Sequence, residues 1–422
     1  MIAINLTKRK ISPEQLFMIS AVIVNGGNYL YNLLLARILG PAQFSDAAVL
    51  ITFVLTLSFI AMTFQVVTAK FSILFNVKVF NLFVSLMYKN AIIIGVLLGM
   101  LTIIFSSKLQ ELFQTSSSLM FVVFGIGVPL YFFMSVNRGI FQGKKEFKYL
   151  AITYQTEMFS RLFVTLGLIL IFGTTSSVTI AFGILISFVF GMFPFRHRYF
   201  NLQKRFKISE VNKNKVQYFF LLTAFYELTQ IIINNSDILL VKHYFDPYNA
   251  GLYASLALIG RVVYFTAWMF VMLLLPKVIE LKKEGKKTHL ILFKYIGYIS
   301  FLSCIITTSC AFFPETIVQL LFGESYLEIS SLLWKYSLAT SLFAISNIFA
   351  YYFLSLDQYI PVIISGIFGL LQLVLIIWFH ETLDQVVQMQ IVAMFALLGV
   401  QILFYILLLS PIKRSQVVKQ KN

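Results

Sequence analysis

The sequence has few charged residues. Of its 422 residues, 12% are charged and 59% are hydrophobic, whereas ordinary soluble domains carry about 25% charged residues. This shortage of charge excludes a soluble globular protein. The apolar residues form long runs rather than alternating ten-residue segments, which disfavours a β-barrel. Because lipid offers no hydrogen bonds to an open backbone, the sequence predicts an all-α polytopic membrane protein.

Residues that carry enzyme chemistry are also scarce. The chain has two cysteines, Cys304 and Cys310, which lie in one apolar segment and would project from different faces of a helix. Its four histidines are scattered and have no close cysteine or carboxylate at metal-ligand spacing. Glycine-rich phosphate loops and a Ser-His-Asp order are missing as well. We therefore predict no catalytic residue, no metal site and no cofactor, and not an enzyme.

Apolar segments suggest about twelve transmembrane helices, near residues 15–38, 44–69, 85–106, 118–140, 149–172, 176–196, 216–242, 250–276, 290–313, 328–355, 359–380 and 387–410. Of the 33 lysines and arginines, 27 fall in the termini and in alternate connections on one side, Arg138 among them, and three fall on the other side, namely Arg37, Lys108 and Lys242. By the positive-inside rule, both termini are cytoplasmic. The net charge of +16 then reflects membrane topology, and no nucleic acid partner is expected.

A basic stretch near the midpoint divides the chain. It predicts an N-terminal six-helix lobe (1–200), a basic cytoplasmic linker (201–215), a C-terminal six-helix lobe (216–410) and a basic cytoplasmic tail (411–422). The turns around Pro41 and Pro247 resemble each other, which suggests an internal repeat. Parallel repeats place a substrate site in a central cavity. Two unrelated outer hairpins with proline and small residues would look similar.

Intramembrane ionisable residues are costly in lipid and are functional candidates by default. Glu157 and Arg161 lie one turn apart and can pair. They either neutralise each other as a structural pair or form a site for an anionic head group, with Glu157 orienting Arg161. Arg261 has no acidic residue three or four positions away. It indicates a cavity or a bound anion, unless it snorkels or pairs with Glu227.

A polar run in the seventh predicted helix offers further candidates. Glu227, Asn235 and Asp237 could couple transport to an ion, or could hydrogen-bond neighbouring helices. Arg37 and Lys335 are additional candidates for binding the anionic head group. The alternatives are that Arg37 complements a helix C-terminus and that Lys335 snorkels to the interface.

Ordered motifs along the chain support a family resemblance. Residues 37–44 read RILGPAQF, residues 138–143 read RGIFQG with Phe147 after them, and Asp237 and Gly260-Arg261 mark the second half. Together they resemble polysaccharide-biosynthesis flippases, in the superfamily that also holds MATE-type exporters and lipid II flippases. Ser45-Asp46 stands where that family usually has glycine. Twelve helices also differ from the fourteen common in lipid II flippases.

The resemblance implies a transporter that works by alternating access. Its substrate would be a polyprenyl-diphosphate-linked oligosaccharide, moved from the inner to the outer leaflet of a bacterial cytoplasmic membrane for cell-surface polysaccharide synthesis. Membrane lipid, H⁺ or Na⁺, and polysaccharide polymerase machinery are the other candidate partners. A multidrug/cation antiporter is the alternative within transport, although buried arginines favour an anionic substrate. A membrane-embedded glycan polymerase or transferase and a non-transporting scaffold are the alternatives outside transport.

Overall fold

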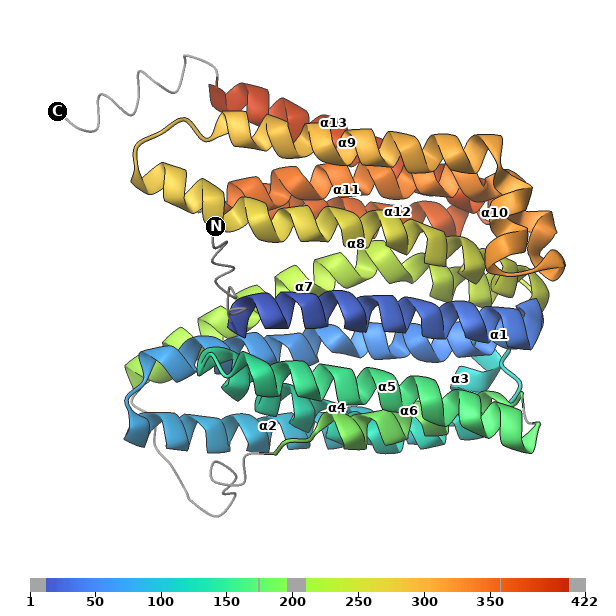
Figure 1. The fold of residues 1–422 in the computed structure, drawn as a ribbon, viewed down its shortest axis with the longest axis horizontal. Helices are drawn as coiled ribbons and strands as arrows, with labels where there is room; N and C mark the ends of the chain where they lie inside the picture. The colour runs from blue at the N-terminus through green and yellow to red at the C-terminus, as the bar shows by residue number, and fades with distance from the viewer. Residues whose placement is uncertain (1–12, 174, 196–209, 357, 410–422) are drawn as a thin grey trace, which may run out of the picture. The chain divides into compact units, whose positions relative to one another are not determined.

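The computed structural model describes residues 13–173, 175–195, 210–356 and 358–409, and Figure 1 shows their helices. The predicted tail and most of the predicted linker lie outside these residues. The elements are α1 (Pro13–Leu74), α2 (Val77–Ile104), α3 (Ser106–Leu112), α4 (Leu119–Gly143), α5 (Phe147–Phe172), α6 (Ser177–Gly191), α7 (Glu210–Tyr244), α8 (Pro247–Lys283), α9 (His289–Phe312), α10 (Pro314–Leu321), the 3₁₀ helix η2 (Glu324–Leu332), α11 (Leu333–Ser355), α12 (Ile360–Trp378) and α13 (Leu383–Leu409).

The predicted all-α fold is confirmed for the described part of the chain. Each of the twelve predicted apolar segments overlaps a described helix, and nine helical stretches of the described residues are long and apolar enough to cross a membrane. The protein is therefore a multi-pass membrane protein. The short helices α3, α10 and η2 were not predicted.

The first two predicted segments are two helical stretches that share the label α1 and meet at a sharp kink. At the kink Gly40 has φ 72° and ψ 171°, and Pro41 follows it. This backbone conformation is available almost only to glycine, because a Cβ would clash with the chain. Proline supplies no N–H to the helical ladder. The glycine and proline that read as an outer turn therefore produce a sharp kink.

The chain folds into two compact units. The first comprises Met1–Asn32 and Leu57–Glu227, and the second comprises Leu33–Thr56 and Leu228–Asn422. The kinked segment 33–56 thus belongs to the second unit, although in sequence it lies far from the rest of that unit. The lobe boundaries near residues 200 and 216 stay a prediction.

Glycines bring helices of the first unit into close contact. Gly139 and Gly143 of α4 face α1, and a Cβ on Gly139 would lie 2.5 Å from the carbonyl oxygen of Gln65. A Cβ on Gly143 would collide with the Ser72 hydroxyl. Without water to drive association, close backbone approach between small residues is a main source of helix packing in lipid. The glycines of the RGIFQG motif therefore position α4 against α1.

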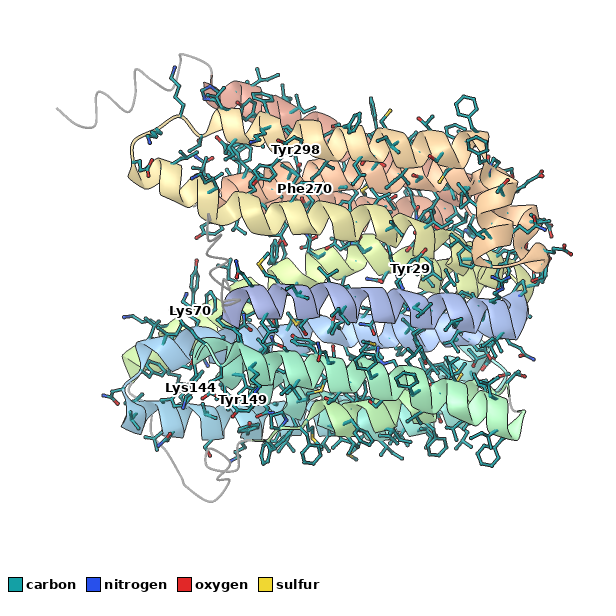
Figure 2. All side chains as sticks on the ribbon, in the orientation of Figure 1. Tyr29, Lys70, Lys144, Tyr149, Phe270 and Tyr298 are labelled. Carbon is teal, nitrogen blue, oxygen red and sulfur yellow. The ribbon has the colours of Figure 1, made fainter. Side chains whose placement is uncertain are left out.

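Basic side chains gather toward one end of the first unit. Lys70 and Lys144 are labelled there in Figure 2, and the Lys70 ammonium lies 3.5 Å from the centre of the Phe219 ring. The Lys144 ammonium lies 4.9 Å from the Phe80 ring. These cation–π contacts let each lysine cover apolar surface while keeping its charge at the helix ends.

In the second unit, α11 is the central helix. It packs against α8, α9 and α13, and its Phe349, Tyr352 and Phe353 join Leu292 and Tyr405 in a buried cluster. In Figure 1, α10 and η2 lie at the opposite end of this unit from the α8–α9 connection.

Candidate functional site

A cluster of three charged side chains joins α4 and α5 in the first unit. Glu157 is buried, and its Oε2 accepts a hydrogen bond from Nη2 of Arg138 at 2.7 Å. Its Oε1 pairs with Nη2 of Arg161, so the predicted Glu157–Arg161 contact is confirmed. Two guanidinium groups therefore share one carboxylate, and the cluster carries a formal net charge of +1.

Arg138 is the member of this cluster that the sequence did not reveal. Counting it among the basic residues of an inside connection was wrong, because it lies within α4 and is only 4% exposed. Its Nε donates to Thr153 Oγ1 at 3.2 Å and its Nη2 donates to the Thr153 carbonyl at 2.9 Å. The Tyr154 ring lies 3.8 Å from its guanidinium carbon. The sequence signal that could have identified Arg138 was the RGIFQG motif, because Arg138 is its first residue.

Arg161 is held by fewer contacts than Arg138. Apart from Glu157, its hydrogen-bond partner among the described residues is Ser187, whose Oγ lies 3.4 Å from its Nε. This distance is at the long end of the usual range. The Arg161 side chain keeps 12% of its surface exposed, compared with 5% for that of Arg138.

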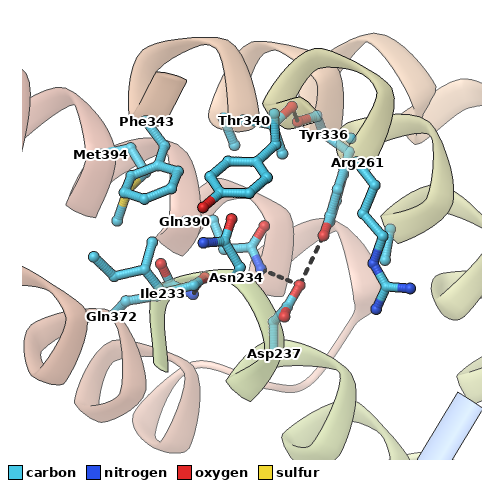
Figure 3. Close-up of a pocket in the computed structure, with 14 residues that line it drawn as sticks. Ile233, Asn234, Asp237, Arg261, Tyr336, Thr340, Phe343, Gln372, Gln390 and Met394 are labelled. Atoms are coloured by element: carbon cyan, nitrogen blue, oxygen red, sulfur yellow. Dashed lines mark hydrogen bonds between the residues drawn. The ribbon is translucent and has the colours of Figure 1, made fainter. Parts of the chain in front are cut away.

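A small cavity in the second unit surrounds Asp237, as Figure 3 shows. Asp237 is 1% exposed, and its Oδ2 accepts hydrogen bonds from the hydroxyls of Tyr253 and Tyr336, both at 2.9 Å. Gln390 Nε2 donates to the same oxygen at 2.8 Å. These donors come from α8, α11 and α13. The interhelical hydrogen bonds considered for Asp237 are therefore present, whereas its Oδ1 is buried without a partner among the described residues.

Arg261 lines the same cavity. Its Nη2 lies 3.5 Å from Oδ1 of Asn235, at the limit of a hydrogen bond. The cavity volume is about 30 Å³, which accommodates a water molecule but not a diphosphate. In this conformation the cavity can hold a water or a small ion beside Asp237. The roles predicted for Asn235, Asp237 and Arg261 stay predictions.

An ion pair attaches the kinked segment to α7 within the second unit. Lys242 Nζ lies 3.0 Å from Oδ1 of Asp46 and 2.6 Å from Oγ of Ser45. The side chains of Lys242 and Asp46 are only 2% and 6% exposed. Assigning Lys242 to an outer loop was wrong, because the residue is buried in α7.

The three remaining predicted residues lie apart from these clusters. Arg37 donates to the carbonyl of Leu320 at 3.1 Å, so its charge meets the C-terminus of α10 rather than that of its own helix. Lys335 pairs with Asp384 at 2.6 Å, and both side chains are partly exposed. Glu227 is half-buried in the part of α7 that belongs to the first unit.

The chain matches a family model described as polysaccharide biosynthesis protein over residues 34–331. This range is more than half of the sequence. The chain belongs to this family. Among proteins with curated functions, none matches it in sequence. The matched range contains the Glu157 cluster, the Asp46–Lys242 pair and Asp237 itself, whereas the Asp237 partners Tyr336 and Gln390, and Lys335, lie beyond it.

Solved structures share the fold at low sequence identity. The chain is similar to the lipid II flippase MurJ in an inward closed conformation, with a TM-score of 0.76, 15% identity and coverage of 93% of this chain and 87% of that chain. It is similar to an inward-facing multidrug resistance MATE transporter of the MOP superfamily, with a TM-score of 0.75, 13% identity and coverage of 89% and 93%. A MOP superfamily transporter from Pyrococcus furiosus gives a TM-score of 0.64 at 14% identity, with coverage of 95% and 94%.

Proposed function

We propose that this protein is a flippase that moves a polyprenyl-diphosphate-linked oligosaccharide from the inner to the outer leaflet by alternating access. It would act in a bacterial cytoplasmic membrane, with both termini in the cytoplasm. The observation that carries the proposal is the net positive charge of the buried cluster of Arg138, Glu157 and Arg161. A buried charge without a counter-ion is costly, and guanidinium groups bind phosphate oxygens through paired hydrogen bonds.

The family supports a role in polysaccharide synthesis. Its description names polysaccharide biosynthesis, and a lipid II flippase has the same fold. A lipid-linked sugar made on one leaflet and used on the other needs a protein that carries its charged head group across the membrane. The lipid tail can stay in the bilayer during this step.

We assign ion coupling to Asp237. Its Oδ1, which has no hydrogen-bond partner in the described part of the chain, and the water-sized cavity beside it suit a proton or a small cation. Asn235 and Glu227, which precede Asp237 along α7, are the further candidates for this role.

A cationic-drug exporter is the second candidate function. A multidrug transporter has the same fold, and Asp237 is a buried carboxylate that a cation could approach. However, Arg261 lines the same cavity and offsets that charge. The net positive charge of the Arg138, Glu157 and Arg161 cluster therefore favours an anionic substrate.

The test is transbilayer movement of a diphosphate-linked oligosaccharide lipid in proteoliposomes, with a cationic dye measured in parallel. We expect lipid movement that Arg161→Ala and Arg261→Ala reduce and that the control Lys286→Ala, at an exposed residue in the α8–α9 connection, leaves unchanged. Asp237→Asn should abolish any dependence on an imposed H⁺ or Na⁺ gradient. Dye movement without lipid movement would refute the flippase and support the exporter.

A further inference from the structure

We propose that Arg138 is a positioning residue that keeps Glu157 neutralised while Arg161 leaves it to bind the diphosphate of the substrate. This inference rests on the proposed function. Arg138 itself would not contact the substrate. It would make Arg161 available to the substrate.

The two oxygens of Glu157 make this exchange feasible. Oε2 is bound by Arg138 and Oε1 by Arg161, so each arginine has its own oxygen. When Arg161 turns to another anion, the carboxylate still has the ion pair with Arg138. A carboxylate with a single arginine partner would lose its only counter-ion in the same movement.

The contacts of the two arginines identify which one can move. Arg138 is also held by contacts other than Glu157, since it donates to both oxygens of Thr153 and stacks on Tyr154. Its neighbour Gly139 is in close contact with α1, so α4 has little freedom there. Arg161 has only Glu157 and the long contact with Ser187 among the described residues. Arg161 is therefore the mobile partner and Arg138 is the fixed one.

The chemistry of the incoming ligand follows from the same geometry. A guanidinium that leaves a carboxylate needs an acceptor of at least equal charge, and a diphosphate provides several anionic oxygens in a fork that matches it. A phospholipid phosphate offers the same type of oxygen with a single charge. A diphosphate-linked lipid and a phospholipid therefore both offer phosphate oxygens to Arg161, and competition between the two lipids for binding distinguishes them.

Loss of Arg138 should weaken binding indirectly. In an Arg138→Gln variant, Arg161 can reach the ligand only by leaving Glu157 as an unpaired buried carboxylate. Breaking a buried ion pair carries a large penalty, so we expect diphosphate affinity to fall by about 100-fold. If Glu157 is also replaced by Gln, no carboxylate remains to be stranded. The double variant should then recover most of the lost affinity.

The experiment measures binding of undecaprenyl diphosphate to the purified full chain in nanodiscs of neutral lipid. The variants are Arg138→Gln, Arg138→Lys, Glu157→Gln, Arg161→Gln and the double variant Arg138→Gln/Glu157→Gln. We expect loss of binding in Arg161→Gln and in Arg138→Gln, near-normal binding in Arg138→Lys and Glu157→Gln, and recovery in the double variant. A residue that contacted the ligand directly would not be rescued by a change at Glu157.

The outcomes separate this inference from the proposed function. If the wild-type chain does not bind undecaprenyl diphosphate, the proposed substrate is wrong. If binding depends on Arg161 but Arg138→Gln has no effect, or is not rescued by Glu157→Gln, the positioning role is overturned. Displacement by an equal concentration of phosphatidylglycerol would overturn the assignment to a diphosphate. Thermal unfolding midpoints identify misfolded variants, and the Arg138→Lys and double variants then decide the question.

Discussion

The ion pair between Asp46 and Lys242 should be a large, separable contribution to stability. The perturbation is removal of one charge at a time, through Lys242→Met or Asp46→Asn, followed by the two changes together. In each single variant the remaining charged group would stay buried after losing its partner in this ion pair. In the double variant neither charge remains.

The expected magnitude follows from the burial of the pair. The two side chains are 2% and 6% exposed and their charged atoms are 3.0 Å apart. Breaking a buried pair by removing one partner costs about 3–5 kcal/mol, whereas replacing both can be nearly neutral. We therefore expect each single change to lower the free energy of unfolding by about 3 kcal/mol or more. The double variant should recover at least about 2 kcal/mol of the summed losses, as a double-mutant cycle would measure.

The assay is reversible unfolding of the purified chain in mixed detergent micelles. Lys335 and Asp384 provide a matched control, because their side chains are 27% and 37% exposed at a separation of 2.6 Å. An exposed pair of this kind contributes about 0–1 kcal/mol, so Lys335→Met should change stability little. Equal effects of Lys242→Met and Lys335→Met, or single losses that simply add in the double variant, would refute the reasoning.

Three further predictions concern local backbone features. Gly143→Ala should lower the free energy of unfolding by about 1–3 kcal/mol because the added Cβ would collide with Ser72. At Gly167 an added Cβ would meet open space, so Gly167→Ala should be neutral or stabilising. The unfolding midpoints of the two variants test this difference. Gly40→Ala should cost about 1–3 kcal/mol because of the positive φ at the kink, and a midpoint equal to that of the wild type would contradict this. Asp246→Ala should cost about 1 kcal/mol because its Oδ1 accepts two backbone N–H groups from the first turn of α8. Partial burial raises the pKa of the Asp246 carboxyl, but the hydrogen bond from the Asn249 side chain, together with the backbone N–H bonds, outweighs it and holds the pKa below the usual 3.8. The capping hydrogen bonds should therefore add to the free energy of unfolding of the wild type above about pH 4, and this contribution should be lost as the pH falls further. The alanine variant should not show this loss.

Hydropathy predicted the spanning segments well because each needs about 20 apolar residues, a signal that does not depend on packing. It also separated the first two segments at the right place. A glycine followed by proline usually ends a helix, and at Gly40 a single non-helical φ/ψ pair interrupts α1 between the two predicted segments. The backbone angles at this break, and so the change in chain direction, depend on packing that hydropathy does not report.

The sequence predicted charged contacts within a helix and missed those between helices. Glu157 and Arg161 could be paired from their spacing of four residues alone. Arg138 lies 19 residues from Glu157 and Lys242 lies 196 residues from Asp46. Pairing over such distances depends on how each helix is rotated, which packing decides and a hydropathy pattern does not report. Both residues were therefore taken for charges at the helix ends.

The burial of Lys242 against Asp46 also implies an order of assembly in the membrane. Asp46 is synthesised 196 residues before Lys242, so the segment 33–56 is made well before the lysine that forms its ion pair. Since a buried carboxylate in a membrane is stabilised by a cationic partner, we expect the segment 33–56 to settle into its final position only after α7 has been inserted. One of the first segments to be made would then be among the last parts of the protein to reach its native place.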